Sequence, residues 1–193
     1  MSSRDQILNR LKNNQPALVD LPAISAYVQE EKDNVKKFSN TLIFIGGSTV
    51  EAEDYNEVIS YIKDQFGEGK RILSTLNELS SIAEVKPRYD DPHTLEDVHL
   101  TIIRAPFGVA ENGAVWITDQ QLPARALPFI SEYLAVVLEK KNIVPTMHEA
   151  YEKINAADYG FGVFIAGPSK TSDIEQSLVL GAHGPKGMVV FLI

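Results

Sequence analysis

Short apolar segments that alternate with helical patterns constrain this chain more than any other feature of its sequence. Residues 48–52 and 71–74 are predicted strands, and each precedes a segment of helical character, at 54–66 and 76–85. In these segments apolar residues recur at the spacing of one helix face. Strands that are joined through helices run in the same direction, because the chain returns before it adds the next strand. The pattern predicts an α/β protein with a mostly parallel sheet.

The rest of the chain adds further strands and two helices. Apolar spacing predicts a helix over 28–45 that Gly46-Gly47 ends, and Pro145 opens a predicted helix over 145–154. A competing interpretation makes 41–45 a strand before a phosphate-binding turn, although the glycine spacing of a P-loop is absent. The remaining strands are predicted at 98–103, 114–118, 134–138, 161–166 and 188–193.

The amino-terminal segment is polar and amphipathic. Residues 2–13 predict a helix with Ser2 or Ser3 as its cap, and the prolines that follow predict an extended connector. We therefore expect an N-terminal helix and connector over 1–22 and one α/β domain over 23–193.

Composition limits the classes of partner and site. The 193 residues include 18 basic and 26 acidic side chains, and the net charge of -8 disfavours nucleic acid or an anionic membrane surface as a partner. No apolar run approaches the roughly 20 residues of a membrane helix, and no signal peptide is evident, so we expect a cytoplasmic protein.

The chain contains no cysteine. Disulfides, a thiolate nucleophile and an iron–sulfur cluster bound by cysteines of this chain are thereby excluded. The four histidines show no metal-binding spacing such as HxxxH. We predict no metal site and no cofactor in this chain.

The segment 167–185, GPSKTSDIEQSLVLGAHGP, is the first candidate site. Gly-Pro ends the preceding strand, and the spacing of Ile174, Leu178 and Gly181 predicts a short helix. Its N-terminus would expose N–H groups that attract an anion beside Lys170; equally, the hydroxyls of this loop would only cap the helix. The candidate ligand-binding residues are Ser169, Lys170, Thr171, Ser172 and Asp173.

The AENGA turn at 110–114 is the second candidate site. Glu111 adjoins Asn112-Gly113, a pair suited to positive φ, immediately before a predicted strand. A carboxylate fixed there suits a nucleophile or general base, with Asn112 and Gly113 beside the ligand. The alternative is a turn residue whose carboxylate binds local N–H groups or an arginine.

Two further residues complete the candidate set. The guanidinium of Arg125 suits a carboxylate ligand or Glu111 itself, unless it is a surface cation. His183, between glycines in GAHGP, suits a proton donor or a ligand contact, unless it ties its loop to a carbonyl. Glu111, Arg125, Lys170 and His183 all lie in turns at strand ends, so we expect them to converge on one pocket.

Both motifs resemble the lactate-utilisation protein C family, the LUD-domain proteins. The resemblance rests on GPSKTSDIE with LVLGAHGP and on GVAENGAVWITD at 108–119, in the same order. It covers nearly the whole chain, more strongly after about residue 98. Lys170 stands where the family more often has arginine, and Asn112 where many members have threonine.

The Glu-Asn-Gly triplet also resembles the active-site turn of family I CoA-transferases, where the glutamate attacks an acyl thioester. The LUD domain is thought to share their fold with ribose-5-phosphate isomerase and glucosamine-6-phosphate deaminase. The resemblance implies a three-layer α/β fold, with a mostly parallel sheet and helices on both faces, behind an N-terminal helical arm. It also implies a catalytic role for Glu111.

For function, the resemblance implies a component of L-lactate utilisation, the oxidation of L-lactate to pyruvate. Iron–sulfur partner proteins would hold the clusters, and this chain would bind a small organic or phosphate anion. The alternatives are a stand-alone enzyme in which Glu111 acts on an acyl or sugar-phosphate substrate, and a non-catalytic anion-binding regulator. The sequence leaves open whether the chain forms a homo-oligomer.

Overall fold

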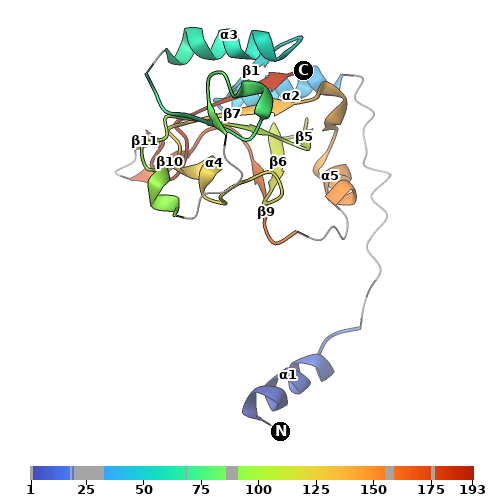
Figure 1. The fold of residues 1–193 in the computed structure, drawn as a ribbon. Coiled ribbons are helices and arrows are strands. Elements are labelled where there is room, and N and C mark those ends of the chain that lie inside the picture. Colours follow the sequence, from blue (N-terminus) through green and yellow to red (C-terminus); the bar gives the residue numbers. More distant parts are fainter. Residues whose placement is uncertain are drawn as a thin grey trace.

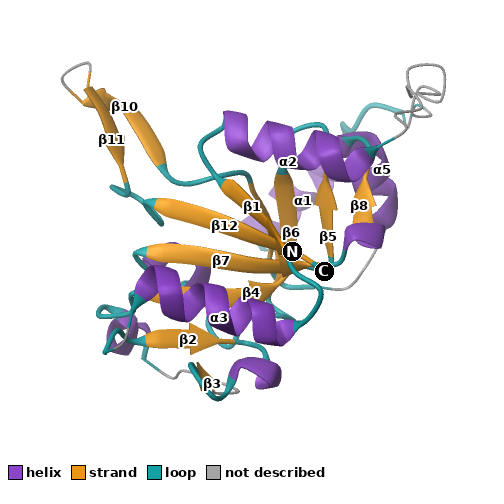
Figure 2. Ribbon diagram, turned by 90° about the horizontal axis from the view of Figure 1, so that it is seen from above, coloured by secondary structure: helices purple, strands orange, loops and turns teal. Residues whose placement is uncertain are grey.

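A six-stranded sheet forms the centre of the computed structural model, which describes residues 2–17, 19, 33–67, 69–85, 91–154, 159–174 and 177–193. The strand order is β1-β12-β7-β4-β2-β3, and every pairing in this sheet is parallel (Figure 2). This confirms the expected parallel sheet. Its strands are β1 (Ser48–Glu51), β2 (Ile72–Ser74), β3 (Glu84–Val85), β4 (Leu100–Arg104), β7 (Tyr133–Leu138) and β12 (Gly187–Leu192).

The central strands are buried on both faces. Along β7, Leu134, Val136 and Leu138 belong to one core cluster, and Ala135 and Val137 to another. The first cluster lies under α2 (Asn34–Phe44) and the second under α3 (Tyr55–Phe66), which is the two-residue alternation of a strand between two layers. Helices therefore cover both faces, and the expected three-layer α/β fold is confirmed.

A second sheet, of order β8-β5-β6-β9, packs on the α2 side. Val115 and Ile117 of β6 join the core cluster of α2, whereas Trp116 points to the opposite face. There α5 (Met147–Ile154) covers it with Ala150 and Ile154. The strands are β5 (Phe107–Val109), β6 (Ala114–Thr118), β8 (Ile143–Val144) and β9 (Gly162–Ile165).

Capping residues set the helix ends. Asp54 accepts hydrogen bonds from Asn56 N and Glu57 N at the start of α3. Asp33 caps α2 in the same way, and Ile45 and Gly46 end it, the latter at φ +91°. The helix interpretation of 41–45 is therefore correct and the strand interpretation is wrong. The predicted helix positions 28–32 lie outside the described residues.

The helix predicted after Gly167 is wrong: the chain forms an antiparallel hairpin of β10 (Lys170–Ile174) and β11 (Ser177–Leu180). Gly181 N donates to Ser169 O at 3.1 Å, so the segment returns to its starting point. A helix of this length would separate those ends by about 15 Å or more. In Figure 2 the hairpin projects beyond the six-stranded sheet.

The helix predicted over 76–85 is also wrong. The segment forms a 3-10 turn, η2 (Asn77–Leu79), and then β3, which pairs with β2. Ile82 N and Ala83 N both donate to Leu79 O, which closes a turn and not a helix. The Arg71 guanidinium binds Glu84 and so favours the strand, which local helical spacing does not reveal. The other short helices are η3 (Pro92–Leu95), α4 (Leu127–Ile130) and η4 (Lys140–Asn142).

The N-terminal helix α1 (Ser3–Asn13) begins as expected at Ser2, whose side chain and Asp5 form a capping box. None of its residues is buried, and Figure 1 shows it apart from the sheets. The connector falls largely outside the described residues, so the division at residue 22 stays a prediction. Among the helices described, none is long and apolar enough to cross a bilayer.

Substituting Gly113 by alanine is expected to lower the free energy of unfolding by about 1–3 kcal/mol. Gly113 adopts φ +67°, and a Cβ there would lie 3.0 Å from Leu42 N, against the backbone of α2. Urea unfolding checks this. Gly69→Ala is the control, since φ is +82° and no atom of the described residues lies within 4 Å of an added Cβ. An equal loss in both variants would contradict the steric explanation.

Deleting residues 2–13 is expected to change the free energy of unfolding by less than about 0.5 kcal/mol, because α1 buries no side chain. Thermal unfolding at several protein concentrations checks this. A large loss would show that α1 packs on the protein in solution.

Candidate functional site

Four polar residues stand immediately before four adjacent parallel strands. Arg71 precedes β2, His99 precedes β4, Glu132 precedes β7 and Lys186 precedes β12. Main-chain hydrogen bonds join neighbours: His99 N donates to Arg71 O at 3.0 Å, and Lys186 N donates to Glu132 O at 2.9 Å. We call these four residues the amino-end row, because they line the edge where the strands begin.

A depression of about 840 Å³ lies over this row. Lys70, Glu96, Asp97 and His183 add charged or titratable groups to it, and apolar side chains form part of its wall. The expected ligand crevice lies outside the carboxyl ends of the strands. This depression is at the opposite edge of the same sheet. The large exposed apolar side chains among its lining residues are Phe129, Ile130 and Leu180.

Glu132 is the centre of the row. Its Oε2 lies 2.5 Å from His99 Nδ1, and its Oε1 accepts a hydrogen bond from the Lys186 ammonium. The Lys186 contact, and after it the His99 contact, hold the pKa of the Glu132 carboxyl below its usual value. The same carboxylate, with Tyr133 beside it, raises the pKa of Lys186. The carboxylate is therefore charged throughout the neutral range.

The His99 ring is held on several sides. Its side chain is only 16% exposed, and the rings of Phe66 and Tyr133 pack on it with centroids 6.0 and 5.1 Å away. With Nδ1 on the Glu132 carboxylate, Nε2 forms no hydrogen bond with any residue that the structure describes. A histidine oriented by a carboxylate in this way can accept or donate a proton at its other nitrogen.

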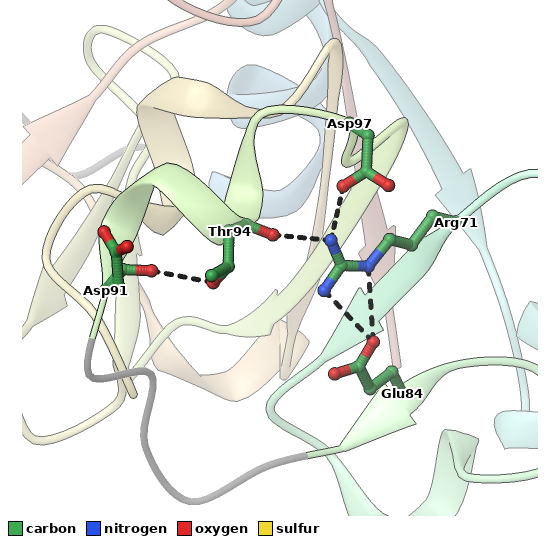
Figure 3. A network of polar contacts seen from close by, with 5 residues as sticks. All are labelled: Arg71, Glu84, Asp91, Thr94 and Asp97. Carbon is green, nitrogen blue, oxygen red and sulfur yellow. Dashed lines mark hydrogen bonds and ion pairs between the residues drawn. The ribbon is translucent and has the colours of Figure 1, made fainter.

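Arg71 has a structural role at the far end of the row. Its guanidinium binds the Glu84 carboxylate at 3.3 Å, Thr94 O at 2.6 Å and the Asp97 carboxylate (Figure 3). These carboxylates raise its pKa further. Thr94 in turn donates to Asp91 O at 2.7 Å, so one arginine joins β2, β3 and η3.

Lys70 and His183 differ from the paired residues. Both side chains are exposed at the depression, and within the described ranges neither makes a hydrogen bond or an ion pair. The Arg71–Asp97 and Lys186–Glu132 pairs largely cancel in charge. Lys70 and His183, together with the Glu96 carboxylate, therefore remain as the groups of the depression that are unpaired among the described residues, and the two basic side chains can contact an anionic ligand.

Glu111 lies elsewhere, in the turn between β5 and β6. Its Oε2 accepts a hydrogen bond from Met147 N at 2.8 Å, at the N-terminus of α5, where a carboxylate is stabilising. The contact agrees with the alternative interpretation of the sequence, in which the Glu111 carboxylate binds a main-chain N–H group. The catalytic role of Glu111 stays a prediction.

The other turn residues have local partners. Asn112 Oδ1 accepts from Ala114 N at 3.0 Å, and Gly113 adopts the expected positive φ. Arg125 Nη2 binds the Asp119 carboxylate at 2.8 Å, and its guanidinium lies 5.7 Å from the Phe161 ring centre. These contacts position the turns, and the ligand-binding roles of Asn112, Gly113 and Arg125 stay predictions.

Lys170 lies close to the end of α2. A Cβ at Gly46 would come 2.8 Å from its ammonium, so the cation lies near the helix C-terminus, where positive charge is stabilising. Ser169 is held by the main chain, through bonds with Pro185 O and Gly181 N. Thr171 pairs with Val179 in the hairpin, and the side chains of Ser172 and Asp173 lie outside the described residues.

The prediction that Glu111, Arg125, Lys170 and His183 converge on one pocket is wrong. Glu111 precedes β6 and Arg125 follows it, so the strand separates them. His183 alone of the four lines the depression over the amino-end row. The sequence pattern that would have identified the row is simple: in each case a polar residue stands directly before an apolar strand.

No group of three or more carboxylate, histidine or cysteine side chains that could hold a metal ion occurs among the described residues. The charges of the site are balanced by protein groups instead, chiefly through the contacts of Glu132 and Arg71.

Together these features define a three-layer α/β protein with a polar site at one edge of its parallel sheet. The LUD domain family model matches residues 25–193. The chain therefore belongs to the LUD domain family, which confirms the resemblance seen in its motifs.

Named relatives agree with this assignment. Lactate utilization protein C of Bacillus pumilus is 32% identical over 112 residues, which are 55% of this chain and 47% of that protein. The protein YkgG of Escherichia coli is 32% identical over 104 residues, 51% of this chain and 45% of that protein. The chain spans about half the length of the curated relatives it matches.

One solved structure is similar in fold. The crystal structure of a DUF162 family protein from Deinococcus radiodurans matches with a TM-score of 0.63 and 14% identity, over 82% of this chain and 95% of that one. At this identity the match supports the α/β fold alone.

Replacing Glu132 by glutamine is expected to lower stability at neutral pH. Because the native pKa of Glu132 is depressed, its contribution is present above the unfolded carboxyl pKa of about 4.3 and is lost as pH falls through the native pKa. The difference from the wild type should vanish on acidification, as urea titrations between pH 7 and 3 would measure. Glu96→Gln, in the same depression, is the control. A difference that persists at low pH would contradict the ion-pair explanation.

Proposed function

We propose that this chain is a component of a lactate-utilisation system and acts with iron–sulfur proteins that carry the electrons. The relatives named lactate utilization protein C support the role in lactate utilisation. The absence of cysteine from the 193 residues supports the assignment of the clusters to partners. The chain would then contribute ligand binding or assembly.

The ligand of this component is a small organic or phosphate anion, bound in the depression over the amino-end row. The observation that carries this proposal is the pair of basic side chains, Lys70 and His183, which form no hydrogen bond or ion pair with any described residue. His99, oriented by Glu132, adds a proton donor or acceptor at the same place. A non-catalytic anion-binding regulator would use the same site.

The stand-alone enzyme with Glu111 as nucleophile is less well supported. The Glu111 carboxylate accepts a hydrogen bond from Met147 N, and Glu111 does not line the depression over the amino-end row. A nucleophile in that position would first have to give up its contact with α5.

Pyruvate and inorganic phosphate are the probes for the anion site. A ligand that binds only the folded state increases the free energy of unfolding, by about 2.7 kcal/mol at a hundredfold excess over Kd. The melting temperature therefore rises. The shift should be lost in the Lys70→Gln/His183→Gln double variant and kept in Lys63→Gln, a basic residue of α3 outside the depression. A shift that survives the double variant would remove the depression from consideration.

The partner proposal has its own experiment. The tagged chain, purified from its native host grown on lactate, is expected to co-elute with iron and acid-labile sulfide in amounts comparable to the protein. The same purification from cells grown without lactate is the control. Elution of the chain without iron under both conditions would contradict the partnership.

A further inference from the structure

A second depression, of about 320 Å³, lies at the carboxyl edge of the six-stranded sheet. It is lined by Arg104, the last residue of β4, together with Thr75 directly after β2, Glu78 of η2 and Gln121 after β6. This is the edge where open α/β sheets ordinarily bind ligands. It shares no residue with the depression over the amino-end row.

Some N–H donors of the Arg104 guanidinium have no acceptor among the described residues. Its Nη2 donates to the Tyr55 hydroxyl and lies 3.3 Å from Glu78 Oε1. Nε is buried, and neither Nε nor Nη1 forms a hydrogen bond with any residue in the described ranges. A guanidinium offers five N–H donors, and buried polar groups are ordinarily satisfied. The Arg104 side chain is 43% exposed and lines the depression.

Gln121 supplies a second oriented donor. Its Oε1 accepts from Thr118 N at 2.9 Å and from Thr118 Oγ1 at 2.7 Å. A main-chain N–H can only donate, so the oxygen of the amide is identified and the nitrogen lies on the other side. The amide nitrogen of Gln121 has no partner within the part of the chain that the structure describes.

Glu78 limits the class of ligand. Its carboxylate lies against Arg104, and Oε2 has no hydrogen-bond partner among the described residues. A dianion such as a phosphate monoester would be repelled by this charge. A monoanion that also carries a hydroxyl would offset the repulsion by donating a hydrogen bond to Glu78.

We propose that this depression binds a small 2-hydroxycarboxylate. The carboxylate accepts hydrogen bonds from Nη1 of Arg104 and the amide of Gln121, and the hydroxyl donates to Glu78. The choice of L-lactate as the probe rests on the proposed role in lactate utilisation. The site itself rests on the unpaired donors around the cavity.

Isothermal titration calorimetry of the full chain tests this site with L-lactate and with propionate, which lacks the hydroxyl. The wild type should bind L-lactate more tightly than propionate. Arg104→Gln and Gln121→Glu should each weaken L-lactate binding at least tenfold. Gln121→Glu keeps the side-chain oxygen that accepts from Thr118 and replaces only the amide nitrogen. It is therefore the matched variant in which we expect the fold to be preserved.

Glu78→Ala has a different expected effect. The substitution removes both the repulsion and the acceptor for the hydroxyl. Propionate should therefore bind this variant more tightly than it binds the wild type, and the ratio of the Kd values for propionate and L-lactate should approach one. The proposal is overturned if the wild type shows no binding of L-lactate or binds L-lactate and propionate with equal affinity. Wild-type affinity in both Arg104→Gln and Gln121→Glu also overturns it.

The Lys70→Gln/His183→Gln double variant separates this site from the one over the amino-end row. Under the present proposal it should bind L-lactate as the wild type does. Loss of L-lactate binding in that variant, with full binding in Arg104→Gln, would overturn the carboxyl-edge site and leave the proposed function standing.

Discussion

The burial of the central parallel strands on both faces is the constraint on which the rest of the structure depends. Residues 134–138 of β7 alternate between the core under α2 and the core under α3, and all five are at most 1% exposed. A strand closed on both faces accommodates charged side chains only at its ends. Both depressions therefore lie at the ends of the same strands, one at each edge of the sheet.

The two edges satisfy their charges differently. At the amino end, Glu132 is shared between Lys186 and His99, and Arg71 between Glu84 and Asp97, so most charges are paired within the protein. At the carboxyl end, Arg104 has one nitrogen in use and two without partners among the described residues. The first arrangement orders a histidine, whereas the second leaves donors for a ligand.

Local signals predicted the elements well where they were strong. The strand Ala114–Thr118 and the helix after Asp54 follow the sequence closely, because periodicity and capping act within a few residues. The local signals predicted the wrong structure at 170–180. Ile174, Leu178 and Gly181 have helical spacing, but the segment forms a hairpin. A segment this short has little helical stability of its own, so the main-chain bond between Gly181 and Ser169 decided its structure.

The sequence by itself determined the α/β class, the helix caps, the positive φ of Gly113 and the absence of any cysteine ligand. Only the tertiary structure decided which strand ends meet, and hence that His99 lies against Glu132, 33 residues later, while Glu111 and Arg125 lie at opposite ends of β6. The physical reason is the distance along the chain over which the determining interactions act. Caps and periodicity depend on neighbours in the chain, whereas a site depends on strand order, which the burial of two sheet faces sets across the whole domain.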